Sequence, residues 1–141
     1  MKVTVPAWIH GHYVGLRQVL DFVGSNTWAW RLEDFHGMSR PGSGLNVLDL
    51  EERLARGASV DYNWQQLLRF ADGVHQMIDG RLVARTSHGN AEDILVIEAL
   101  DSSLWTVEAR KDLEPAVAAV ERIAGLSVRT APQSERRSPG P

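Results

Sequence analysis

A chain of 141 residues, with 43% hydrophobic and 23% charged residues, has the size and composition of one globular domain. It contains no cysteine, which excludes a disulfide scaffold, a thiolate metal site and a cysteine nucleophile. The net charge is −3 and only the C-terminal tail is basic, so we expect no nucleic-acid-binding surface. The chain begins without the apolar core of a signal peptide, and its apolar runs are strand-sized. We therefore expect a cytoplasmic protein that makes no membrane contact.

The first third of the chain predicts an edge strand, a helix and a half-buried strand. Residues 3–9 are β-prone but contain a proline, which is tolerated at a sheet edge or in an irregular entry. Residues 13–23 place apolar side chains at helical spacing, and the glycine that follows is a typical helix stop. In residues 27–32 the side chains alternate, which puts Trp28 and Trp30 on one face of a strand.

Residues 33–46 predict the longest loop inside the domain. Loops of this length usually carry function or move. Residues 45–50 then predict a short strand, and residues 51–56 a helical turn that ends at the next glycine. Val60 belongs to a further short strand or to the approach of the next helix.

The middle of the chain predicts a long helix, a turn and a strand. Asp61 or Asn63 can cap the helix, and its apolar stripe continues as far as Ile78. The Asp79-Gly80 pair then predicts a turn into a strand over residues 81–86.

The C-terminal part predicts a hairpin, a helix and a closing strand. Strands over residues 93–100 and 104–109 pair across the Asp-Ser-Ser turn between them. A helix over residues 113–124 has a proline in its first turn, where proline is tolerated, and residues 127–130 can rejoin the sheet.

Together these elements predict a single α+β domain over residues 1–130. Its sheet is mostly antiparallel, with five or six strands, and its helices pack on one face. Residues 131–141 are rich in proline, serine and arginine and predict a disordered C-terminal tail.

Two parts of the sequence resemble known proteins. The first is the hairpin pattern of residues 97–107 ahead of the acidic helix start Asp112-Leu113-Glu114. The second lies upstream and consists of Gly15-Leu16 and Val19-Leu20, followed by Trp28-Ala29-Trp30-Arg31-Leu32. The pattern resembles a family of small bacterial α+β proteins and some immunity proteins of polymorphic toxin systems. The resemblance implies a small bacterial α+β fold, and it carries over no catalytic residue.

His10 and His12 form the first candidate site. Side chains two residues apart in a strand share a face, so both imidazoles can reach one metal ion or one phosphate. A third ligand would be His36 or Asp34. The alternative interpretation is two histidines near a strand end, one hydrogen-bonded and the other solvated.

The second candidate lies in the predicted loop and consists of Asp34, His36 and Arg40. A carboxylate, an imidazole and a guanidinium on a glycine-flanked loop can bind a partner or an anion, or perform acid–base chemistry. The alternative is that they are the ordinary solvated side chains of a loop.

An acidic stretch and one tryptophan complete the candidates. Asp49, Glu51 and Glu52 are interleaved with two arginines and can be a solvated helix face. They can equally be the acidic surface of an inhibitor that binds a basic enzyme. Trp8 is the tryptophan that we expect at the surface, where it can anchor a partner.

Two functions are compatible with these residues. The expected one is a non-enzymatic interaction protein, such as an immunity-type inhibitor, because no catalytic motif occurs. It would occlude a partner protein, a toxin or another basic enzyme, without a cofactor, using Trp8, the 33–46 loop and the acidic 49–61 region. A homodimer is equally compatible with an exposed tryptophan. The alternative is a small enzyme or ligand-binding domain, with or without a metal, that uses His10, His12, Asp34 and His36.

Overall fold

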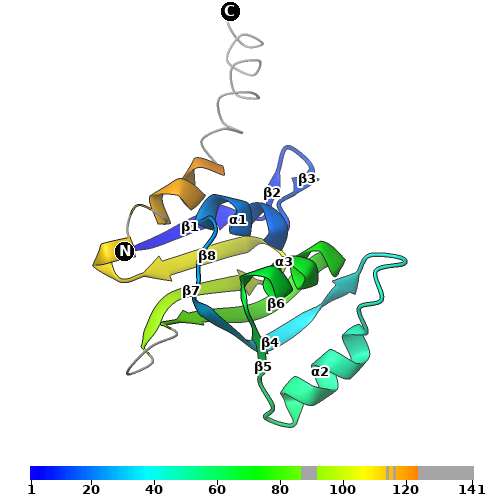
Figure 1. Cartoon of the computed structure of the whole chain (residues 1–141). Coiled ribbons are helices and arrows are strands. Elements are labelled where there is room, and N and C mark those ends of the chain that lie inside the picture. The colour runs from blue at the N-terminus through cyan, green and yellow to red at the C-terminus, as the bar shows by residue number, and fades with distance from the viewer. Residues whose placement is uncertain (87–91, 114, 116, 124–141) are drawn as a thin grey trace, which may run out of the picture.

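One antiparallel sheet forms the centre of the fold (Figure 1). The computed structural model describes residues 1–86, 92–113, 115 and 117–123. Six strands cross the sheet in the order β1-β8-β7-β6-β4-β5, and a separate hairpin pairs β2 with β3. The strands are β1 Lys2–Pro6, β2 Trp8–Ile9, β3 His12–Tyr13, β4 Ala29–Ser39, β5 Val60–Tyr62, β6 Val74–Arg85, β7 Asp93–Leu100 and β8 Leu104–Ala109. The predicted α+β class with an antiparallel sheet is confirmed.

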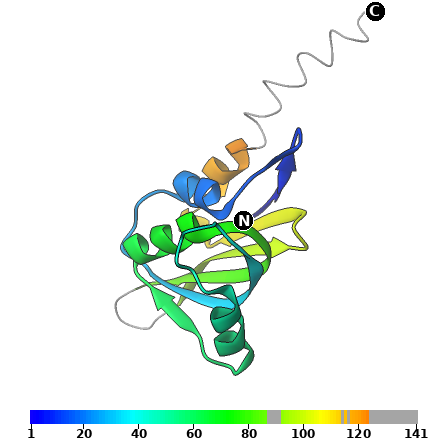
Figure 2. The ribbon, with the colours of Figure 1, turned by 90° about the vertical axis from the view of Figure 1, so that its right-hand side faces the viewer.

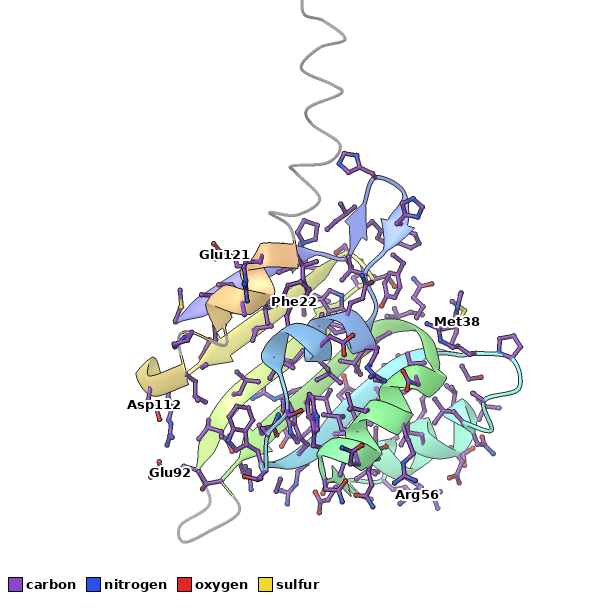
Figure 3. The ribbon with its side chains drawn as sticks, turned by 45° about the horizontal axis from the view of Figure 1, so that its top comes forward. Phe22, Met38, Arg56, Glu92, Asp112 and Glu121 are labelled. Carbon is purple, nitrogen blue, oxygen red and sulfur yellow. The ribbon has the colours of Figure 1, made fainter. Side chains whose placement is uncertain are left out.

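Except for one helix at the edge, the helices pack on one face of this sheet (Figures 1 and 2). They are α1 Leu16–Val23, α2 Val47–Ala55, α3 Trp64–Gly73 and the 3₁₀-helix η1 Lys111–Leu113, and residues 117–123 are also helical. The 117–123 helix lies beside α1, where the guanidinium of Arg122 is 6.0 Å from the ring centroid of Phe22 (Figure 3). By contrast, α2 lies apart from α1 and α3 and packs along β4.

Strand alternation gives the sheet a buried face and an open face. In β7, Ile97 and Ala99 are buried under the helices, whereas Glu98 between them is partly exposed on the other side. We call this other side, which also carries Lys2 and Arg81, the open face. At its centre Arg81 lies 3.1 Å from the Glu98 carboxylate and 2.9 Å from that of Glu33, so these charges neutralise one another.

Two tryptophans are fixed at the centre of the core. Trp30 and Trp105 are each 1% exposed. The Nε1–H of Trp30 donates to Asn26 Oδ1 at 2.9 Å, and that of Trp105 donates to the Val14 carbonyl at 2.8 Å. Because a buried indole N–H needs an acceptor, these bonds set the position of each ring.

The first half of the predicted 33–46 loop is a strand, so that prediction was wrong for residues 33–39. β4 continues through Ser39 and pairs with β6, with register shifts after Leu32, His36 and Met38. The first shift leaves Glu33 as an extra residue in β4, which breaks the simple alternation by which a strand is recognised, whereas the other two leave extra residues in β6. Only residues 40–46 connect β4 to α2.

The predicted boundary between the long helix and the next strand was also wrong. The helix ends at Gly73, and residues 74–80, predicted as helix and turn, are the first half of β6. Gly80 lies inside this strand, where a Cβ atom would collide with the Met77 side chain. The apolar residues of this segment fit a helical stripe, but pairing with β4 from Val74 onward makes them a strand.

Elsewhere the local predictions are largely confirmed. The β7–β8 hairpin has the predicted bounds, and α1 ends before Gly24. The short strand predicted for residues 45–50 was wrong, because Asn46 caps a single helix by accepting the Asp49 N–H at 3.0 Å. The proposed strand over residues 127–130 and the tail 131–141 lie outside the described residues.

None of the helices within the described ranges combines the length and hydrophobicity that a membrane span requires.

Two half-buried tyrosines predict a loss of stability at alkaline pH. Burial raises the pKa of Tyr13 and of Tyr62 above the usual 10.0, and smaller effects of the Met77 backbone and Arg53, respectively, oppose it. The folded state therefore holds both phenol protons more tightly than the unfolded state does. The contribution of the two tyrosines to the free energy of unfolding is therefore fully present below pH 10.0. It is lost as the pH rises through their folded-state pKa values.

We expect the urea midpoint to fall above pH 10.0, and Tyr62→Phe to make this fall shallower. Tyr13→Phe should also destabilise the protein at neutral pH. Its hydroxyl accepts the Met77 N–H at 3.0 Å and lies 3.3 Å from the Met77 carbonyl. An unchanged alkaline slope in Tyr62→Phe would contradict the assignment.

Candidate functional site

The outer half of β4 presents Asp34 and His36 on the open face. Phe35, between them, is 1% exposed and packs edge-on against Phe70, with the ring centroids 5.5 Å apart. Because successive residues of a strand point to opposite faces, the buried ring of Phe35 keeps its two neighbours on the open side. β6 holds this part of β4 in register, with His36 opposite Asp79.

Helix α2 lies along the edge of β4 that β5 does not reach. β5 pairs with β4 only from Trp30 to Leu32. Farther along the strand, the Glu51 carboxylate of α2 accepts a hydrogen bond from the Gly37 N–H at 3.4 Å. Glu51 thus satisfies an edge donor that a neighbouring strand would otherwise bind.

These two elements place an imidazole between two carboxylates. His36 Nε2 is 3.9 Å from Asp34 Oδ1, and His36 Nδ1 is 3.7 Å from Glu51 Oε1. The side chains of His36 and Asp34 are 59% and 58% exposed, and that of Glu51 is 26% exposed, so a partner can reach the group. We call Asp34, His36 and Glu51 the acidic site. Asp34 and His36, from the predicted loop, therefore lie beside Glu51, from the predicted acidic stretch.

Several carboxylates elsewhere in the fold have an arginine counter-ion, which the acidic site lacks within the described ranges. Glu33 pairs with Arg81, Asp61 with Arg31, and Glu52 with Arg56. Among the residues that the structure describes, no arginine or lysine lies within salt-bridge distance of the acidic site. The acidic site therefore has no arginine or lysine of its own, within the described residues, to balance its two carboxylates.

The remaining charged candidates have local structural roles. Glu52 and Arg56 form an exposed i, i+4 pair at 3.7 Å, which contributes little to stability. Asp49 lies in the first turn of α2, where a carboxylate is favoured by the helix dipole. Arg40 follows β4, and its backbone N–H donates to the Gly73 carbonyl at 2.8 Å.

Two exposed apolar side chains that no sequence pattern singled out lie close in the chain to residues of the acidic site. Leu48 is 72% exposed and lies one helical turn before Glu51. Met38 is 44% exposed and follows His36 by two residues near the outer end of β4 (Figure 3). The one signal in the sequence for the exposure of Leu48 is its position outside the apolar stripe of α2, which Leu50 and Leu54 form.

The hairpin carries the other candidates. Trp8 is 48% exposed, as expected, and its ring contacts that of Tyr13 at 5.3 Å. His10 and Gly11, with φ of 51° and 78°, form the two-residue turn between β2 and β3. The chain reverses between His10 and His12, so the argument that they share one face of a strand was wrong.

No cluster of three histidine, cysteine, aspartate or glutamate side chains suited to a metal ion occurs within residues 1–86, 92–113, 115 and 117–123. The alternative metal site of His10, His12 and His36 is therefore not assembled. Two hollows, of about 310 and 170 Å³, lie beside the start of α3 and on the open face near Lys2, and no residue of the acidic site lines either.

The chain matches no protein-family model, no curated protein and no solved structure. The geometry and chemistry of the acidic site therefore carry the functional argument.

Replacing Glu51 tests whether this side chain fixes α2 to β4. We expect Glu51→Ala to lower the free energy of unfolding by about 1 kcal/mol, because the partly buried Gly37 N–H loses its acceptor. Glu51→Gln, which keeps an acceptor oxygen, should lose less. Urea denaturation measures both, with the solvated Glu52→Ala as the matched control. Equal stability of Glu51→Ala and Glu52→Ala would contradict the role of Glu51.

Proposed function

We propose that this chain is a non-enzymatic interaction protein that binds and occludes a basic partner protein through the acidic site. The observation that carries this proposal is the exposed carboxylate–imidazole–carboxylate group, which has no arginine or lysine counter-ion in the described part of the chain. A partner's arginine or lysine can supply the missing positive charge. Charge-assisted bonds to carboxylates are short and directional, and an arginine can make two of them.

The apolar flanks make the same surface suitable for protein binding. Both are exposed: Leu48 lies one helical turn before Glu51 on α2, and Met38 lies two residues after His36 on β4. Interfaces gain most of their affinity from a few apolar or aromatic anchors, whereas complementary charge mainly speeds association and sets specificity. A surface with both can orient a basic partner and retain it.

The class of partner follows from this chemistry and from the sequence resemblance to immunity proteins. An enzyme that acts on a phosphate-rich substrate has a basic active-site surface, which an acidic protein can cover. We therefore propose an immunity-type inhibitor as the biological role, with a toxin or another basic enzyme as its target. Trp8 is an additional anchor of this proposal, because nearly half of its surface is exposed.

Affinity capture tests the proposal. The purified chain is used as bait in an extract of the organism that encodes it, alongside Asp34→Lys and the matched control Glu108→Lys. Both positions are exposed, and each lies on a strand of the same sheet. We expect a stoichiometric basic protein that the wild type and Glu108→Lys retain and Asp34→Lys loses. Capture that is indifferent to Asp34→Lys would contradict the proposal.

A further inference from the structure

The open face carries an apolar strip at the end where β7 turns into β8. Leu100 and Leu104 are register partners across this hairpin, and Pro6 of β1 is the partner of Leu104 on its other side. Leu100 is 41% and Leu104 is 37% exposed, whereas their neighbours Ala99 and Trp105 are buried in the core. Alternation therefore places both leucines on the open face. We call Pro6, Leu104 and Leu100 the apolar strip.

The apolar strip continues directly toward the acidic site. The Asp101 N–H, next to Leu100, donates to Asp79 Oδ1 at 2.9 Å, and Asp79 is the register partner of His36. One row of positions thus crosses β1, β8, β7, β6 and β4. With neighbouring strands about 4.8 Å apart, the row is roughly 19 Å long. It is apolar at the β1 end and acidic at the β4 end.

The next row of the open face has different chemistry. There Thr4 pairs with Thr106, Thr106 with Glu98, and Glu98 with Arg81, and the row ends at Asp34, the register partner of Arg81 on β4. Arg81 is already bound by Glu33 and Glu98, so between β1 and β6 this row offers a partner neither unpaired charge nor an apolar side chain, and only Asp34 at its β4 end adds to the acidic site. The difference between adjacent rows indicates where on the open face an occupant would lie.

We infer that the occupant is a protein segment with an apolar end and an arginine- or lysine-rich end, lying across the five strands. This inference rests on the proposed function and extends it by giving the segment a direction. Its apolar end covers Leu100 and Leu104, and its basic end reaches Asp34 and Glu51. Single exposed leucines are common on protein surfaces, but here they adjoin one another and continue into an acidic site.

A displayed peptide library tests the direction. A library of random 16-residue peptides is selected on the immobilised full chain, and a selected peptide is titrated by fluorescence anisotropy. We expect selected peptides to contain an apolar block and a basic block. Leu100→Ser/Leu104→Ser should weaken binding by about tenfold or more, as loss of interface anchors does. Lys2→Ser, at the other end of β1, is the matched control and should change binding by less than about twofold.

The outcomes separate this inference from the proposed function. Peptides that are lost with Asp34→Lys but retained by Leu100→Ser/Leu104→Ser would overturn the inference and leave the acidic site standing. Peptides indifferent to both variants, or a selection that enriches none, would overturn the inference and count against the acidic site. Thermal melts of each variant show that the fold is retained, which the exposure of both leucines leads us to expect.

Discussion

Replacing Trp105 by alanine is expected to lower the free energy of unfolding by about 3–5 kcal/mol. The side chain is 1% exposed and belongs to the core between the sheet and the helices. Its removal would leave a cavity and would also strip the Val14 carbonyl of its indole donor, now at 2.8 Å. Small domains are stable by only about 5–15 kcal/mol, so the loss is a large part of the total.

Chemical denaturation of two further variants separates the two contributions at Trp105. Trp105→Phe keeps most of the volume but loses the N–H donor, so it should fall between wild type and Trp105→Ala. Trp8→Ala is the matched control, because it removes the same group from a 48% exposed position. We expect it to change stability by less than about 1 kcal/mol. Equal losses in Trp105→Ala and Trp8→Ala would contradict this description of the core.

Gly37→Ala is expected to destabilise the protein by about 1–3 kcal/mol through steric overlap. A Cβ atom at this position would collide with the Gln76 carbonyl, and it would lie only 2.8 Å from the Phe35 ring. The carbonyl belongs to β6, so it cannot move away without disturbing the β4–β6 pairing. The same shift would displace the Gly37 N–H from Glu51 and alter the acidic site.

Gly73→Ala provides the control for this substitution. Its Cβ would meet the Leu45 side chain at 3.4 Å, a contact that a loop residue can accommodate, and alanine favours the helix that ends there. We expect unchanged or slightly increased stability, measured by urea denaturation beside Gly37→Ala. Equal stability of Gly37→Ala and Gly73→Ala would show that β6 leaves enough space for a side chain at position 37.

The sequence predicted elements whose signals are local. The β7–β8 hairpin is one, because Asp101 and Ser102 take up the positive φ values of its turn, 50° and 57°. Prediction from the sequence failed where pairing between distant segments decides the structure. In β4 the extra residue Glu33 breaks the alternation, and at Val74 pairing with Ser39 makes a strand of residues that fit a helical stripe.

The acidic site was predictable only in its parts. Asp34, His36 and Glu51 were candidates on chemical grounds, but their contact depends on α2 lying along the free edge of β4. No local sequence pattern predicts that α2 lies along β4. The role of Leu48 was missed for a related reason, since its exposure is decided by which face of α2 packs against β4.

The most direct test of the central claim is the dissociation constant of the captured partner, measured by isothermal titration calorimetry. It is compared among wild type, Asp34→Lys and Glu108→Lys. The acidic site predicts that Asp34→Lys weakens binding by about tenfold or more, because reversal brings like charges together. Glu108→Lys should stay within about twofold of wild type. Equal constants for the two variants would show that the acidic site does not bind the partner.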